Sequence, residues 1–203
     1  MNRQISLGLL LGFVSLVLFF LIPVASPPLL FGTPEAQQSD VASGSQQISP
    51  APAFSAETLR ALPTSGWLTN GGNLFNQRFS PLTQINRQNV ADLKGVWRAR
   101  LGGSGVGNKY SGEAQPIVHE GVVYIVTGAD DVFAISVATG EILWTYEAHL
   151  NPEISTVCCG WASRGVALGE GKVYDGQLNG RLVALDQQTG EIVWSTQAER
   201  WQE

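Results

Sequence analysis

The feature that most constrains this fold is a segment that recurs fifty residues further along the chain. Gly121–Trp144 aligns with Gly171–Trp194 without a gap, and both copies end in a Thr-Gly-Glu-Ile-x-Trp hairpin. A fixed period of this size indicates a repeat architecture. Within the first copy, the short β-branched runs Val122–Val126, Val132–Val137 and Glu141–Tyr146 alternate with glycine turns, which favours strands over helices.

Each copy of the repeat closes on a tryptophan, Trp144 or Trp194, and a partial earlier unit, Asn89–Trp97, ends in the same way. A tryptophan is large enough to wedge between neighbouring sheets, and packing between blades is the core of a propeller. Short strands repeating at this period therefore predict an all-β fold made of β-propeller blades. An antiparallel sandwich with coincidental internal similarity is the alternative.

The length of the repeat region limits the number of blades. Propellers typically have about 4–8 blades, whereas residues 89–203 hold about two units, of an expected eight. We therefore expect this chain to be the front of a longer protein. Assembly of one ring from several chains is the alternative.

The first part of the chain has the composition of an export segment. Ile5–Ile22 is uncharged and apolar, and Arg3 precedes it. Its length is near the border between a secretory apolar region of about 7–15 residues and a spanning helix of about 17–25 residues. Residues 1–32 are thus predicted to be a signal peptide or a membrane anchor, with an apolar helix over residues 5–22. Both alternatives place the rest of the chain in the periplasm.

The remaining boundaries follow from composition. Residues 33–55 are rich in Ser, Gln, Pro, Ala and Gly, so we expect a flexible linker that buries too little apolar surface to order itself. Residues 56–203 are assigned to the blades. Charged residues make up 14% of the chain and its net charge is −5, with no basic block, which argues against nucleic-acid binding. His119 and His149 are isolated, which argues against a zinc site.

The chain has two cysteines, Cys158 and Cys159, and they are adjacent. Neighbouring Cα atoms lie about 3.8 Å apart, less than the roughly 4.4–6.8 Å that an ordinary disulfide spans. A ring closed between them would be strained, and strain of this kind tends to persist where it has a use. Two reduced thiols are the alternative. The pair is the strongest pointer to function in the sequence.

Several segments between Trp67 and Trp194 resemble the quinoprotein alcohol dehydrogenases, which use pyrroloquinoline quinone (PQQ). The Ala184-x-Asp186-x-x-x-Gly190-Glu191-x-x-Trp194 motif resembles the tryptophan-docking motif of that family, although the upstream copy has Ser136 in place of the aspartate. The other matching segments are Trp67–Gly72, Asn76–Leu82, Gly112–Pro116, and Cys158-Cys159 with Arg164 five positions on.

The resemblance implies a cofactor role for four residues: Glu113, Cys158, Cys159 and Arg164. In this family a disulfide ring between the adjacent cysteines lies against one face of the quinone. The arginine binds a cofactor carboxylate, for which a guanidinium can donate two parallel hydrogen bonds. The glutamate lies at the cofactor's edge, where it accepts or shares a proton. Trp161, near the cysteines, is interpreted as a packing residue.

No catalytic residue and no metal ligand are assigned in this chain. The resemblance implies a calcium or lanthanide ion, whose ligands belong to later blades, as does the catalytic aspartate. Asp130, Asp131 and Asp175 are predicted to lie in turns and do not match those ligands.

The implied function is that of the N-terminal portion of a periplasmic PQQ-dependent dehydrogenase. The complete enzyme would oxidise an alcohol by hydride transfer to the quinone and pass electrons to a cytochrome c or a membrane quinone, and this chain alone would be inactive. The alternative is a non-catalytic propeller that acts as a scaffold in envelope protein assembly. That alternative leaves Arg164 and the cysteine pair without a purpose.

Overall fold

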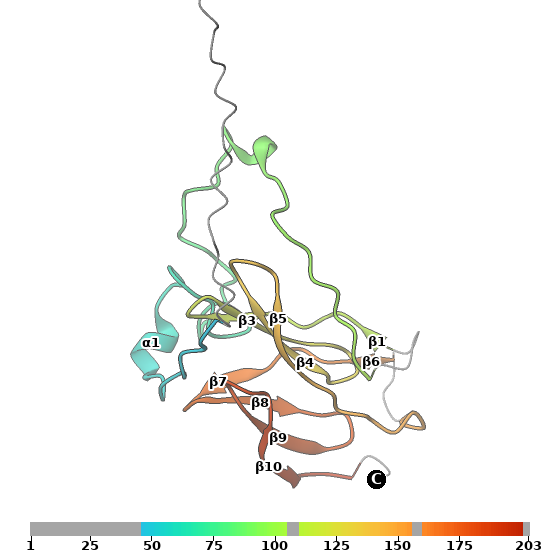
Figure 1. Ribbon diagram of the computed structural model, residues 1–203. Helices are drawn as coiled ribbons and strands as arrows, with labels where there is room; N and C mark the ends of the chain where they lie inside the picture. The colour runs from blue at the N-terminus through green and yellow to red at the C-terminus, as the bar shows by residue number, and fades with distance from the viewer. Residues whose placement is uncertain (1–45, 105–109, 156–159, 201–203) are drawn as a thin grey trace, which may run out of the picture. The chain divides into compact units, whose positions relative to one another are not determined.

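The structure is a computed structural model, and it describes residues 46–104, 110–155 and 160–200. Two antiparallel four-stranded sheets dominate it, each pairing strands in chain order (Figure 1). Blade 1 contains β2 (Ile117–His119), β3 (Val122–Val126), β4 (Val132–Ser136) and β5 (Ile142–Tyr146). Blade 2 contains β7 (Ala167–Gly169), β8 (Lys172–Gly176), β9 (Arg181–Asp186) and β10 (Ile192–Gln197). The prediction of all-β propeller blades is confirmed.

The first hairpin of each blade turns on a Glu-Gly pair. Glu120 and Gly121 have φ values of 44° and 76°, and Glu170 and Gly171 have φ values of 50° and 68°. Two central residues with positive φ are typical of the type I′ turn, whose twist matches that of antiparallel strands. The same local sequence therefore fixes the same strand register in both blades.

Trp144 at the end of blade 1 docks on the last hairpin turn of blade 2. Its indole Nε1 donates a hydrogen bond of 2.9 Å to the carbonyl oxygen of Gln187. Its ring lies so close to Gly190 that a Cβ added there would come within 2.6 Å of it. Glycine also suits the φ of 75° at this position. The Thr-Gly turn thus provides a carbonyl acceptor and a flat surface for the tryptophan.

Trp97 makes the same contact with blade 1. Its Nε1 donates a hydrogen bond of 2.8 Å to the carbonyl oxygen of Val137, and a Cβ at Gly140 would come within 2.6 Å of its ring. The end of the partial unit predicted over residues 89–97 therefore occupies the place of a blade-ending tryptophan.

Trp194 repeats the side-chain arrangement of Trp144 but stays exposed. The ring centroids of Tyr174 and Trp194 lie 6.1 Å apart, and those of Tyr124 and Trp144 lie 6.2 Å apart. Tyr124, against which Trp144 packs, is fully buried, whereas Trp194 at the equivalent position of blade 2 is 40% exposed to solvent. The outer face of blade 2 is thus the counterpart of the face that blade 1 buries against blade 2.

The main hydrophobic core contains residues of both blades. Blade 1 contributes side chains from β2 to β5 and blade 2 from β7 to β9, including Val122, Tyr124, Val126, Trp144, Leu168, Val173, Val183 and Leu185. The buried positions alternate with more exposed ones along β3 and β8, as in a half-buried strand, whereas β4 is buried at every residue. Packing between the blades is therefore the principal core of the described residues.

Gln46–Phe54, called the strap here, runs along the first hairpin turn of each blade. Ile48 and Ala51 of the strap are 5% and 3% exposed and belong to the main core. The amide of Gly171 donates to the carbonyl oxygen of Ala51 at 2.7 Å. The Gln46 side chain donates to the carbonyl oxygen of Gly121 at 3.2 Å.

The strap overlaps the segment predicted as a flexible linker, residues 33–55, and the structure differs there from the prediction. Buried Gln187 is the main reason. Its side-chain oxygen accepts from the Ala51 amide at 2.6 Å, and its nitrogen donates to the carbonyl oxygen of Ser49 at 3.1 Å and to the Tyr124 hydroxyl at 2.8 Å. Hydrogen bonds from the blades order a segment that has few large apolar side chains of its own.

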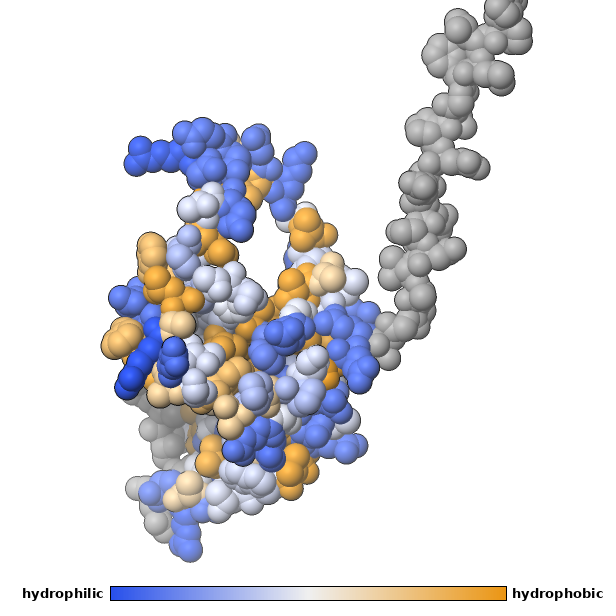
Figure 2. Space-filling view, turned by 90° about the vertical axis from the view of Figure 1, so that its left-hand side faces the viewer, coloured by the Kyte–Doolittle hydropathy of each residue, from blue (hydrophilic) through white to orange (hydrophobic). Residues whose placement is uncertain are grey.

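The rest of the described chain is mostly irregular. The helix α1 (Ala56–Arg60) is capped by Ser55, whose side chain accepts from the Thr58 amide at 3.1 Å. A long arm containing the 3₁₀ helix η1 (Val90–Asp92) precedes Trp97. Figure 2 shows hydrophilic residues at the tip of this arm, at the top of the view. Within the described ranges, no helix has the length and apolarity needed to cross a membrane. The predicted apolar helix over residues 5–22 lies outside the described residues.

Candidate functional site

Two short parallel strands bring together two of the residues with a predicted cofactor role. β1 (Tyr110–Ser111) pairs with β6 (Trp161–Ala162), with Ser111 opposite Ala162. Glu113 follows the end of β1 by two residues, and Arg164 follows the end of β6 by two residues. The equal offset on parallel strands places them side by side, with 3.2 Å between Arg164 Nε and Glu113 Oε2.

The backbone at Arg164 is fixed by the segment before blade 1. Its carbonyl oxygen accepts hydrogen bonds from the Asn70 side-chain nitrogen at 2.9 Å and from the Gln115 amide at 3.3 Å. The Glu113 carboxylate is oriented in turn, because the Ser111 hydroxyl donates to Glu113 Oε1 at 3.1 Å. Sequence reasoning gave no role to Asn70 or Ser111, since these contacts join segments far apart in the chain or depend on a side-chain rotamer.

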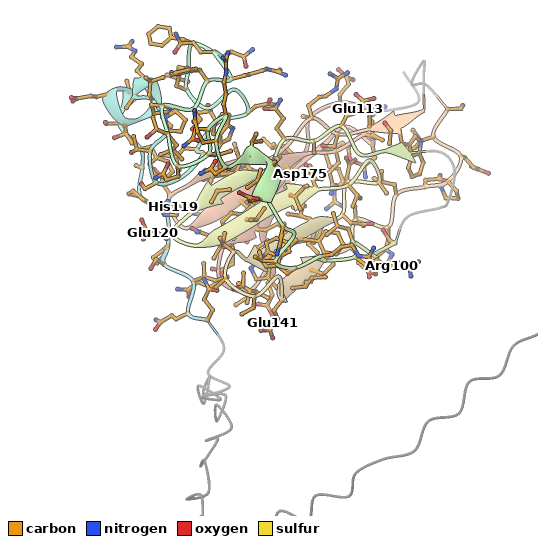
Figure 3. The ribbon with its side chains drawn as sticks, turned by 90° about the horizontal axis from the view of Figure 1, so that it is seen from above. Arg100, Glu113, His119, Glu120, Glu141 and Asp175 are labelled. Atoms are coloured by element: carbon orange, nitrogen blue, oxygen red, sulfur yellow. The ribbon has the colours of Figure 1, made fainter. Side chains whose placement is uncertain are left out.

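Both charged side chains remain open to solvent. The side chain of Arg164 is 79% exposed and that of Glu113 is 46% exposed. Figure 3 shows Glu113 at the periphery, beside the arrows of β1 and β6. An exposed pair of this kind contributes little to stability, and most N–H groups of the guanidinium stay available. These N–H groups could donate hydrogen bonds to a carboxylate of a ligand.

The other two residues with a predicted cofactor role, Cys158 and Cys159, lie outside the described residues. Their disulfide and their stacking against the quinone stay predictions. Trp161, which follows them, is 2% exposed, and its Nε1 donates to the carbonyl oxygen of Ile154 at 3.0 Å. The interpretation of Trp161 as a packing residue is confirmed.

Three aspartates near one end of the blades are deeply buried. Asp130, Asp131 and Asp175 are each 1% exposed. Asp130 and Asp131 lie in the turn between β3 and β4, as predicted, whereas Asp175 lies within β8, so its assignment to a turn was wrong. Asp175 is buried within the strand because side chains alternate along β8, which places Val173 and Asp175 on the same buried face.

Asp130 and Asp131 hold loops in place. Asp131 Oδ1 accepts from the Ala148 amide at 2.9 Å and from the Ser104 hydroxyl. Asp130 Oδ2 accepts from the Leu178 amide of blade 2 at 2.7 Å. Burial raises the pKa of Asp130 to about 7, although the hydrogen bond from Leu178 opposes this. Among the described residues, no group of three or more His, Cys, Asp or Glu side chains is arranged to hold a metal ion.

Comparison with known proteins connects this chain to one family. Residues 67–195 match the family described as the PQQ glucose/ethanol/alcohol dehydrogenase β-propeller domain. The dehydrogenase subunit of alcohol dehydrogenase (quinone) from Gluconacetobacter polyoxogenes is 42% identical over 130 residues, which is 64% of this chain and 17% of that protein.

Solved structures agree with the sequence match. The quinohemoprotein alcohol dehydrogenase from Comamonas testosteroni superposes with a TM-score of 0.65 at 36% identity, covering 71% of this chain and 21% of that one. A europium-containing methanol dehydrogenase superposes with a TM-score of 0.61 at 27% identity, covering 71% and 25% of the two chains. The chain thus spans between a sixth and a quarter of the length of these relatives. On the match over residues 67–195, the chain belongs to the family of PQQ-dependent alcohol dehydrogenase β-propellers.

Proposed function

We propose that this chain is the N-terminal part of a periplasmic PQQ-dependent dehydrogenase that oxidises alcohols, and that it supplies one wall of the cofactor site. The observation that carries the proposal is the pairing of Arg164 with Glu113 at a solvent-open edge, 3.2 Å apart, in a chain of this family. The rest of the cofactor site, including the metal ligands and the catalytic base, belongs to later blades.

Each residue at this edge has a defined task in the proposal. Arg164 binds a carboxylate of PQQ through its guanidinium N–H groups. Glu113, oriented by Ser111, accepts or shares a proton at the cofactor's edge. The ring of Cys158 and Cys159 provides a flat, uncharged surface for the cofactor plane. When bound, PQQ supplies the acceptor for the hydride of the alcohol.

The proposal also includes a metal ion and an electron acceptor for the complete enzyme. A calcium or a lanthanide ion would assist the cofactor, and the europium-containing methanol dehydrogenase supports the lanthanide option. The electron acceptor in the proposal is a cytochrome c or a membrane quinone, and the name of the Gluconacetobacter polyoxogenes relative, alcohol dehydrogenase (quinone), supports a quinone. Residues 1–32 would direct export, either as a cleaved signal or as an anchor in the inner membrane.

Arg164→Ala is expected to weaken PQQ binding by the complete protein about 10- to 100-fold, because a charge-assisted hydrogen bond contributes roughly 1.5–3 kcal/mol. Arg164→Lys should give an intermediate loss, since it keeps the charge and loses the planar fork. Equilibrium dialysis against PQQ measures both. The control is Arg181→Ala in blade 2, where the guanidinium donates to the Ser195 hydroxyl at 2.7 Å, away from this edge. Unchanged affinity in Arg164→Ala would remove the role proposed for it.

Replacing both Cys158 and Cys159 with serine is expected to lower PQQ affinity, because the stiff stacking surface is lost. Mass spectrometry of the non-reduced, exported protein should find no free thiol at either position. Two free thiols, or a double variant with the affinity of the parent, would contradict the role of the pair. A complete protein that does not bind PQQ at all would instead favour the scaffold alternative.

A further inference from the structure

Asp175 places a carboxyl group in the interface between the two blades. Along β8, Val173 and Asp175 are buried while the residues beside them are more exposed. Val173 belongs to the core shared with blade 1, so the same face of β8 carries Asp175 against blade 1. In the ungapped overlay of the two repeats, the position equivalent to Asp175 is Ile125. An acidic group thus stands where the other repeat has an aliphatic one, and the acidic residue is buried.

The carboxyl group of Asp175 has no hydrogen-bond partner in the described part of the chain. Both of its oxygens are buried and unpaired, and so is the side-chain oxygen of Gln177, a residue that is 6% exposed. The Gln177 nitrogen donates to the Tyr146 hydroxyl of blade 1 at 3.2 Å. Gln177 lowers the pKa of Asp175, but the two side chains do not form a hydrogen bond of ordinary length and angle. An ionised carboxylate in such a place is strongly unfavourable.

The charged groups that face Asp175 across the interface are acidic. Asp130 and Asp131 approach it from the β3–β4 turn of blade 1, and both act to raise its pKa. The ion pair of Arg164 with Glu113 lies at the β1–β6 edge, and that of His149 with Glu147 flanks Ala148, whose amide donates to Asp131. Burial is the largest cause and, with the two aspartates, raises the pKa of Asp175 to about 8, while Gln177 lowers it.

We propose that Asp175 carries a proton at neutral pH, and that its loss at alkaline pH weakens the interface between blade 1 and blade 2. The proton neutralises a buried carboxyl group that has no hydrogen-bond partner among the described residues and lies near two other acidic side chains. The inference concerns blade packing and does not depend on the proposed function. It gives the fold a pH-sensitive element at a position where the other repeat is aliphatic.

The direction of the pH dependence follows from the two protonation equilibria. The unfolded chain releases this proton near the ordinary aspartate pKa of 3.8, whereas the folded chain keeps it up to a pKa of about 8. The folded state therefore binds more protons between these values, and stability falls as the pH rises through this range. Asp130 titrates close to Asp175, at a pKa of about 7, so the two are expected to titrate as a coupled pair.

The test is the thermal midpoint of the full chain at about pH 6 and about pH 9. We expect the midpoint of the parent protein to fall by roughly 5–10 °C over this range. Asp175→Asn should lose most of that dependence, and Asp175→Ile, which restores the residue of the other repeat, should also raise the midpoint at about pH 9. The control is Asp92→Asn in η1, which removes an exposed carboxylate and should keep the pH dependence of the parent.

A second measurement tests the protonation of Asp175 directly if unfolding is not cooperative. The infrared carbonyl band of a protonated carboxylic acid should be present in the folded protein at about pH 6, fade by about pH 9, and be reduced in Asp175→Asn. A parent protein that shows neither the band nor the midpoint shift would overturn the proposal. So would an Asp175→Asn variant that retains both.

Discussion

Trp144→Ala is expected to lower the free energy of unfolding by about 3–5 kcal/mol, the range found when a large buried aromatic side chain is truncated. The change removes the ring that packs on Gly190 and the hydrogen bond to the carbonyl oxygen of Gln187. It also removes the partner of the Tyr124 ring in the core. Denaturant unfolding followed by circular dichroism measures the effect without depending on indole fluorescence.

The matched control is Trp194→Ala, at the equivalent position of the next repeat. Because 40% of Trp194 is exposed, its loss should cost about 1 kcal/mol in this chain. Equal losses in the two variants would show that docking on the neighbouring turn contributes little to stability. A large difference would assign the stability to contact between blades, since the two tryptophans share their local sequence.

Gln187→Leu is expected to cost about 2–5 kcal/mol, because it leaves two buried polar groups and one partly buried group without this partner, each buried one worth roughly 1–3 kcal/mol. These groups are the Ala51 amide, the Ser49 carbonyl oxygen and the Tyr124 hydroxyl. Since two of them belong to the strap, we expect the strap to separate from the blades before the blades themselves unfold. Hydrogen exchange should then show faster exchange at Ala51 and at Gly171, whose amide donates to the strap.

The neighbouring glutamine provides the control for this variant. Gln188 donates a single side-chain hydrogen bond, 3.1 Å long, to the carbonyl oxygen of Ile48, and it is exposed. Gln188→Leu should therefore cost less than about 1 kcal/mol and leave exchange at Ala51 slow. Slow exchange at Ala51 in Gln187→Leu as well would show that apolar burial of Ile48 and Ala51 and the remaining hydrogen bonds hold the strap without Gln187.

The strands of the blades could be predicted because their signals are local. The run Val122–Val126 is β3 itself, and the run predicted over residues 132–137 differs from β4 by one residue. Short β-branched runs bounded by Gly turns decide both strand type and register, and the ungapped repeat doubles the signal. The docking role of the tryptophans followed from their position at the end of each unit.

The meeting of Glu113 with Arg164 could not be deduced from spacing. The two residues are far apart in sequence, and the parallel pairing of β1 with β6 that joins them is a tertiary contact between two-residue strands. The resemblance to the family assigned both residues to one site, and the structure places them 3.2 Å apart. Their roles toward the cofactor stay predictions.

The order of the strap and the buried position of Asp175 were not predicted from the sequence, for different reasons. The strap has the composition of a linker and is ordered by Gln187, a residue more than 130 positions away. For Asp175 a signal was present, because the overlay of the repeats pairs it with Ile125. A carboxyl group that takes the place of an aliphatic residue within a strand pattern indicates a buried acid rather than a turn.

Because each blade offers a tryptophan on one side and a glycine turn with an acceptor carbonyl on the other, the unit is compatible with copies of itself. Tandem duplication of such a unit creates no mismatched surface, so an array can lengthen by whole units during evolution. Asp175 limits this interchangeability, because exchanging the first unit for another would also have to accommodate an acidic group.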